Sequence, residues 1–338
     1  MDFCATIFLF GEEGAAAVLV PVRQNETNYP MKKSTDRIDL HMHSTVSDGT
    51  DTPEEILAHV RETGLDIFSV TDHDAILAGC RIAPHLRRND PLFITGVEFS
   101  CRDKYGQYHI LGYGYSPEAR SIQHIVEKGH AIRMEKTEKR LQFLRERFGF
   151  IFPDEEVREL LSKNNPGKPH IAALMIRHGY ATDISDALHQ YINKKKFPDI
   201  FIRPEEAIAA ILDSGGIPVL AHPSFGSGDE LIVGREMDDR LCRLIAEGLL
   251  GVEAYYSGFT PKLQEEMLSF ASRYSLYVTA GSDYHGKNKL VRLGSNNLMS
   301  VKHAHEGLHR FLNDVRYLSA SVKLSGEEAR NEAAVAGT

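Results

Sequence analysis

Histidines and carboxylates recur at short spacings in this chain. His41 and His43 are two residues apart, so a β-strand would place both imidazoles on one face and Met42 on the other. Imidazole is the usual nitrogen ligand of Zn²⁺, Mn²⁺ and Fe²⁺, and carboxylates supply oxygen ligands. An HxH pair alone is weak evidence for a metal site, so its neighbours decide the question.

Nine residues could bind metal, and most of them stand at the ends of β-rich runs. They are His41, His43, Asp48, His73, Glu98, His109, His222, Asp283 and His285. Taken singly, His109 could be a core histidine, and Glu98 could cap a helix or pair with an arginine. Because burying so many ionisable groups at strand ends without a cation is unfavourable, the set predicts a metal cluster.

The elements that must position these residues are seven β-rich runs, at 37–43, 66–73, 92–98, 107–113, 217–222, 251–256 and 276–283. Most are almost continuously apolar, which is typical of parallel strands covered on both faces. Helical patterns lie between several of them, at 53–64, 204–216 and 260–274. Thr52 as N-cap, Pro53 in the first turn and Gly64 at the end define the first helix. The alternation predicts an α/β fold with a parallel sheet, closed into a barrel that carries its site at the C-terminal strand ends.

Residues 117–200 interrupt this alternation with helical patterns and no strand signal. We therefore expect a barrel formed by residues 36–116 and 201–320, with residues 117–200 inserted as a helical lid that binds substrate. A closing helix is expected at 303–315. Residues 1–35 should be a poorly ordered extension, or residues 1–30 a mis-assigned start, since Met31-Lys32-Lys33-Ser34 resembles an ordinary bacterial start. Gly11-Glu12-Glu13-Gly14 divides the apolar runs, so no signal peptide is expected.

Composition excludes several classes of protein. The 338 residues carry a net charge of −8, with 42% hydrophobic and 25% charged residues, as in ordinary globular proteins. No run approaches the roughly 18 apolar residues of a membrane span. The negative charge argues against binding to duplex nucleic acid. Four cysteines without metal-site spacing indicate reduced thiols in a cytoplasmic protein, and nothing points to an obligate protein partner.

Six segments make a family resemblance specific. DLHMHSTVSDGTDTPEEI, VTDHDAILAG, GVEFS, HILGYG, VLAHPS and AGSDYHG follow one another over about residues 37–290. In these motifs the chain resembles the polymerase and histidinol phosphatase (PHP) family. The resemblance implies a distorted seven-stranded (β/α) barrel with a centre of two or three divalent ions that hydrolyses phosphate esters. It places one ion with His41, His43, Glu98 and Asp283, a second with Glu98, His109 and His222, and a third with Asp48, His73 and His285.

Phosphate esters resist hydrolysis because the anionic phosphoryl group repels hydroxide, which is scarce at neutral pH. Clustered Mn²⁺, Zn²⁺ or Fe²⁺ would lower the pKa of a bridging water and hold the phosphoryl oxygens. We accordingly expect catalytic roles for four of the ligands: Asp48, His73, Glu98 and His222. Asp72 and Asp74 are candidates to orient the imidazoles, although either could instead cap the following helix.

The insertion narrows the expected substrate. Lys168-Pro169-His170, Arg177-His178-Gly179 and DSGGIPVLAHPSF resemble the PHP subgroup that removes the 3'-phosphate of nucleoside 3',5'-bisphosphates or degrades short RNA from its 5' end. The subgroup's R-x-x-R pattern runs here from Arg133 to Lys136, and lysine lacks the bidentate fork of arginine. Arg133, His170 and Arg177 are candidates to bind a second phosphate. Lys194-Lys195-Lys196 is more typical of a solvated run.

Three alternatives compete with a nucleotide phosphatase. A histidinol-phosphate phosphatase of the same family fits the helical insertion less well. A non-catalytic PHP regulatory module should have lost metal ligands, and none of the nine is lost. A C–N hydrolase of the amidohydrolase type shares the HxH pair and a late aspartate, but its metal-bridging lysine is not apparent.

Overall fold

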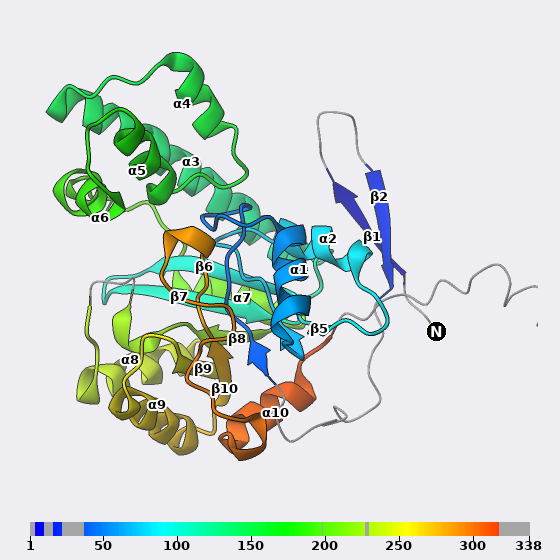
Figure 1. The fold of residues 1–338 in the computed structure, drawn as a ribbon. Coiled ribbons are helices and arrows are strands. Elements are labelled where there is room, and N and C mark those ends of the chain that lie inside the picture. The colour runs from blue at the N-terminus through cyan, green and yellow to red at the C-terminus, as the bar shows by residue number, and fades with distance from the viewer. Residues whose placement is uncertain (1–3, 10–15, 22–36, 198, 227–229, 318–338) are drawn as a thin grey trace, which may run out of the picture.

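The computed structural model describes residues 4–9, 16–21, 37–197, 199–226 and 230–317. The main body of the protein contains two sheets, one of five strands and one of three (Figure 1). The larger has the strand order β10, β9, β8, β7, β6 (Tyr277–Gly281, Gly251–Tyr256, Ile217–Leu220, Gln107–Tyr113, Gly96–Arg102). The smaller has the order β3, β4, β5 (Ile38–Asp39, Ile67–Phe68, Leu92–Phe93). Each of the seven β-rich runs therefore contains a strand.

The run 92–98 is divided between the two sheets, as β5 and β6. Gly96 permits the crossing, because a Cβ at this position would lie 2.1 Å from the Oγ of Ser69. On the other side, the backbone N–H of Leu40 donates to the carbonyl of Ala280 at 2.9 Å. The sheets thus meet in a barrel-like manner at both edges, but the described residues contain no closed sheet.

The expectation of a sheet that is parallel throughout is wrong for β7. This strand runs antiparallel to both β6 and β8. A tight turn joins β6 to β7, in which the carboxylate of Asp103 accepts hydrogen bonds from the backbone N–H groups of Tyr105 and Gly106, at 2.7 and 2.9 Å. Strands joined by so short a turn can pair only antiparallel, because a parallel pair needs a long crossover.

The predicted helices of the barrel are present. Helix α1 (Pro53–Thr63) begins after Thr52, whose side chain accepts from the backbone of Glu55, and it ends at Gly64 in the left-handed conformation. Helices α7 (Pro204–Asp213), α9 (Pro261–Arg273) and α10 (Glu306–Asp314) cover the larger sheet. Helices α2 (Leu77–Ile82) and α8 (Gly234–Ala246) are also present and were not predicted. None of the described helices combines the length and apolar character of a membrane span.

The secondary-structure elements described within the insertion are all helices, and it projects to one side of the sheets (Figure 1). It contains α3 (Arg120–Phe148), α4 (Asp154–Leu161), α5 (Lys168–Arg177) and α6 (Ile184–Asp186), followed by short turns to Lys194. These elements bury a core of their own, formed by Leu144, Phe152, Leu160, Ile171, Ala172, Leu174, Met175, Ala181, Ala187 and Ile192. A separate core is what an inserted subdomain requires. Its role as a lid stays a prediction.

Of the predicted extension, residues 1–35, the structure describes only the antiparallel strands β1 (Cys4–Leu9) and β2 (Ala16–Pro21). The rest of that prediction lies outside the described residues. Cys80, Cys101 and Cys242 are free thiols.

Candidate metal centre

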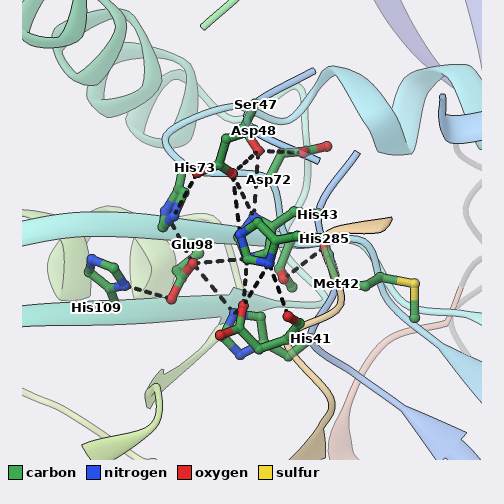
Figure 2. Close-up of polar contacts among 12 residues, drawn as sticks. His41, Met42, His43, Ser47, Asp48, Asp72, His73, Glu98, His109 and His285 are labelled. Atoms are coloured by element: carbon green, nitrogen blue, oxygen red, sulfur yellow. Dashed lines mark hydrogen bonds and ion pairs between the residues drawn. The ribbon is translucent and has the colours of Figure 1, made fainter. Parts of the chain in front are cut away.

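The HxH pair behaves as its spacing predicts. His41 and His43 follow β3 with their ring centroids 5.3 Å apart, whereas Met42 turns into the apolar core (Figure 2). A Cβ on Gly281 would lie 2.2 Å from the Cβ of His41, so only glycine allows β10 to approach this closely. The chain therefore brings both imidazoles against the end of β10.

Glu98 occupies the middle of the cluster (Figure 2). One carboxylate oxygen lies 2.9 Å from Nδ1 of His109 and 3.1 Å from Nε2 of His222. The other lies 3.1 to 3.4 Å from nitrogens of His41, His43 and His73. A carboxylate placed between two groups of imidazoles is suited to bridge two cations.

Asp283 and Asp48 complete the cluster on the far side of the HxH pair. Oδ1 of Asp283 lies 3.3 Å from Nε2 of His43 and 3.4 Å from Nδ1 of His285. Oδ1 of Asp48 lies 3.4 Å from Nε2 of His285, and its Oδ2 lies 3.9 Å from Nε2 of His73. All nine predicted ligands are therefore gathered at one place.

Four overlapping sets of these residues bring donor atoms within 4.8 Å of one another: His43, Asp48, His73 and His285; His41, Glu98 and His222; His41, His43 and Asp283; and His73, Glu98 and His109. Several residues belong to two sets. The division among three ions that the family resemblance implies therefore stays a prediction.

A second, independent observation also indicates that the donor atoms could bind divalent cations. Nε2 of His41, Nε2 of His43 and Nδ1 of His73 are buried and have no hydrogen-bond partner. Buried polar atoms without partners are rare, because each loses its hydration without replacement. Three of them directed into one cluster of carboxylates are explained by a ligand that accepts nitrogen lone pairs.

The charges of the centre are strongly perturbed. Burial raises the pKa of Glu98, but the surrounding imidazoles outweigh it and hold that pKa well below its usual range. The pKa values of Asp48 and Asp283 are lowered in the same way. Burial lowers the pKa of His43, yet the carboxylates of Asp283 and Glu98 raise it to about 10. The carboxylates are therefore anionic at neutral pH and attract positive charge.

The backbone is strained where three of these strands end. Asp74, His222 and Asp283 have φ values of 50°, 25° and 57°, in the left-handed region that side chains rarely adopt. Such strain persists only where the surroundings enforce it, and it concentrates at functional sites.

Asp72 and Asp74 do not cap the following helix, because α2 begins after Ile76 without a side-chain cap. Asp72 instead accepts hydrogen bonds from the hydroxyls of Ser44 and Ser47, both at 2.6 Å, and so holds the loop that carries Asp48. Asp74 accepts from the backbone N–H of Ser100 at 2.9 Å. Both residues fix backbone segments next to the centre, and no hydrogen bond to an imidazole is found for either among the described residues.

Sequence reasoning missed Glu253 in β9. This buried carboxylate lies 3.0 Å from Nδ1 of His41, and its other oxygen accepts the backbone N–H of His222 at 2.7 Å. It also missed Lys289, whose ammonium contacts the carboxylate of Asp283 at 2.5 Å. Alternation within GVEAYY could have placed Glu253 on the same face of the sheet as Tyr255, whereas no signal singles out Lys289.

The predicted substrate residues are placed differently from one another. Nε of Arg133 contacts Asp74 at 2.5 Å, beside the centre. Burial lowers the pKa of His170, and the carboxylate of Asp48 opposes that shift. Arg177 pairs with Glu156 at 2.8 Å, and its side chain is 62% exposed. It lines a 160 Å³ cavity together with His170, but no described contact joins it to the nine clustered residues.

Comparison with known proteins gives a consistent result. A model of the PHP domain matches residues 39–210. Over 74% of this chain and 94% of its own length, a phosphoribosyl 1,2-cyclic phosphate 1,2-diphosphodiesterase of Eggerthella lenta is 30% identical. A 5'-3' exoribonuclease of Haemophilus influenzae (78% and 94% covered) and a 3',5'-nucleoside bisphosphate phosphatase of Chromobacterium violaceum (73% and 87%) are each 26% identical. A crystal structure from Bifidobacterium adolescentis, titled as a candidate metal-dependent phosphoesterase, matches with a TM-score of 0.69 and 27% identity over 86% of this chain and 99% of that one.

Proposed function

The chain belongs to the PHP domain family and is a metal-dependent phosphoesterase, and we propose that it removes phosphate from nucleotides. The substrates we propose are nucleoside 3',5'-bisphosphates or short 5'-phosphorylated oligonucleotides. The observation that carries this proposal is that a basic side chain of the insertion lies beside the nine clustered residues. Arg133 contacts Asp74, the residue that follows His73. The relatives named as a bisphosphate phosphatase and an exoribonuclease support it.

We propose two or three divalent ions, Mn²⁺, Zn²⁺ or Fe²⁺, held by the nine clustered residues within a distorted seven-stranded barrel. Such ions would supply a water of lowered pKa and neutralise charge on the phosphoryl oxygens. Glu98 would share its two oxygens between ions, since they face different imidazoles. The Glu253 carboxylate fixes the ring of His41, so that its Nε2 faces the centre.

A second phosphate would lie between Arg133 and His170. Nδ1 of His170 accepts the backbone N–H of Gly167 at 3.0 Å, so Nε2 carries the proton and can donate to a phosphate oxygen. The guanidinium of Arg133 donates to the hydroxyl of Ser100 at 2.9 Å and stays partly exposed. Arg177 would first have to leave its ion pair with Glu156. A cytoplasmic location is proposed with this substrate and is supported by the free cysteines.

A second candidate is hydrolysis of a cyclic phosphodiester, which the 30% identity to the Eggerthella lenta enzyme favours. The same donor atoms could act on either ester, so the substrate must be decided by measurement.

The test is release of inorganic phosphate by the Mn²⁺-loaded protein from adenosine 3',5'-bisphosphate, 5'-AMP and histidinol phosphate, and release of mononucleotides from a 5'-phosphorylated RNA dinucleotide. Opening of phosphoribosyl 1,2-cyclic phosphate is followed in parallel. We expect preference for the bisphosphate or the dinucleotide, and an Asp283→Ala variant serves as the inactive control. Preference for histidinol phosphate or the cyclic ester would overturn the nucleotide assignment.

A further inference from the structure

One face of α3 carries three cations in succession. Arg133, Lys136 and Arg140 are three and four residues apart, so they lie on adjacent turns. Arg133 reaches Asp74, which directly follows His73, so this face begins at the metal centre. The guanidinium Nε of Arg140 is buried without a hydrogen-bond partner.

The charges along this face repel one another. Burial and the neighbouring Arg140 lower the pKa of Lys136 to about 8. Burial and the neighbouring Arg133 lower the pKa of Arg140 to about 10. Partly buried like charges destabilise a fold unless an anion joins them. The face therefore has the electrostatics of a site for phosphate groups.

Beyond Arg140 the face opens into a cavity of about 310 Å³. The cavity is lined by Lys139, Gln142, Phe143, Glu146, Lys195, Lys196, Phe197, Asp199 and Ile200. The ammonium of Lys195 lies 5.8 Å from the ring centre of Phe143 and 5.9 Å from that of Phe197. The guanidinium of Arg140 lies 4.9 Å from the ring centre of Phe197. Cations beside aromatic rings are the combination that single-stranded nucleic acid sites use for phosphates and bases.

Two acids, Glu146 and Asp199, also line the cavity, and Lys139 pairs with Glu135 at 2.6 Å, so the cations left to bind an anion are Arg140, Lys195 and Lys196. Glu146 accepts a hydrogen bond from Gln142 at 2.8 Å. Among the described residues, no carboxylate pairs with Arg140, Lys195 or Lys196. The smaller cavity beside Arg177, of about 160 Å³, is lined by no phenylalanine or tyrosine on which a base could stack, so it is the weaker candidate.

The length of the face matches a short strand. Arg133 and Phe143 are ten residues apart on α3, which is about 15 Å at the helical rise. A stacked strand advances about 3.4 Å per nucleotide, so roughly four nucleotides would span this distance.

We propose that this cavity and the α3 face from Lys136 to Phe143 form a downstream subsite, which binds the nucleotides beyond the reacting phosphate of a single-stranded oligonucleotide. This proposal rests on the proposed function and adds a binding site for the remaining nucleotides of the oligonucleotide. A mononucleotide ends at Arg133 and His170, so it does not use the subsite.

The test compares Lys195→Ala and Lys195→Ala/Phe143→Ala with Lys194→Ala, an exposed neighbour that does not line the cavity. Binding of a 3'-labelled, 5'-phosphorylated RNA tetranucleotide to the Mn²⁺-loaded protein is measured by fluorescence anisotropy. Turnover of the tetranucleotide and of adenosine 3',5'-bisphosphate is measured alongside. We expect tetranucleotide affinity to fall about tenfold in both Lys195 variants. Lys194→Ala and all turnover of the bisphosphate should match wild type.

An equal loss of turnover on the tetranucleotide and on the bisphosphate would indicate damage to the fold or to the metal centre, and it would overturn the proposed subsite. Unchanged tetranucleotide binding in both Lys195 variants would also overturn it, while turnover of the bisphosphate would leave the proposed function standing. If wild type hydrolyses neither substrate, the proposed function fails, and the anisotropy measurement still decides the subsite.

Discussion

Replacing Glu253 by glutamine tests how the metal centre is held. The carboxylate of Glu253 is fully buried and accepts on both oxygens, from Nδ1 of His41 at 3.0 Å and from the backbone of His222 at 2.7 Å. Glutamine has almost the same shape but carries one oxygen and one NH₂ group. It can therefore satisfy only one of the two donors.

Both orientations of the new amide disturb the site. With NH₂ toward His222, two donors face each other, and a buried N–H loses its partner at a cost of about 1–3 kcal/mol. With NH₂ toward His41, Nδ1 must accept, so the proton moves to Nε2, the nitrogen that faces Glu98. A protonated Nε2 cannot bind metal. Changes to such supporting groups typically weaken metal affinity by about 10- to 100-fold, and we expect Glu253→Gln to fall in this range.

The assay is competition for Mn²⁺ or Zn²⁺ against a chromophoric chelator, with phosphate release as a second measurement. Glu265→Gln, on the exposed face of α9, is the matched control and should equal wild type. Thermal unfolding of the metal-free proteins separates a loss of fold from a loss of affinity. Metal affinity within twofold of wild type in Glu253→Gln would refute the reasoning.

Three further predictions follow from particular contacts. Asp283→Ala and His43→Ala should abolish turnover yet keep the wild-type circular dichroism spectrum, and retained activity in either would contradict the metal cluster. Asp72→Asn, which weakens the bonds to the loop carrying Asp48, should raise the Mn²⁺ concentration for half-maximal activity about tenfold; an unchanged metal dependence would count against it. The pKa of Lys136 is lowered to about 8 in the fold, so between pH 8 and 10.5 the unfolded chain binds more protons and stability rises with pH. Between pH 7.5 and 9.5, the free energy of unfolding of the wild type, measured in urea, should rise by about 2 kcal/mol relative to that of Lys136→Met. If the free energies of the two proteins depend on pH in the same way, Lys136 does not titrate in this range.

The parts of the fold that depend on local pattern were predictable. Helix α1 starts and ends where Thr52 and Gly64 place it, because capping needs only residues near in sequence. The antiparallel β7 was missed although its turn was visible: Asp103 and Gly106 separate two apolar runs by too few residues for a crossover helix. The error came from assuming a strand–helix–strand connection where the link between the two strands is too short to contain a helix.

The residues assigned from a resemblance to a subgroup were less reliable than the ligands assigned from their position at the ends of strands. Arg177 was selected because it stands in a segment that resembles a nucleotide-directed subgroup, and its side chain points to Glu156 instead. Arg133 was selected in the same way and contacts Asp74, which follows His73 beside the centre. Spacing in a helix fixes which face a residue occupies, but which of two helical faces meets the barrel depends on the packing of the insertion, which no short motif encodes.

The division of ligands among ions is the step that spacing alone could not reach, and the reason is chemical. An imidazole has two nitrogens, and the nitrogen that stays available is decided by the partner of the other one. Glu253 occupies Nδ1 of His41, so only Nε2 is left for a cation. On His43, Nδ1 lies 3.5 Å from the hydroxyl of Ser47 and 3.7 Å from Asp48, and Nε2 lies 3.2 Å from Glu98. A cation beside Glu98 would meet Nε2, whereas a cation beside Asp48 could bind Nδ1 only in place of the weak contact with Ser47. The spacing of residues in the sequence shows neither contact, so it cannot assign His43 to one ion.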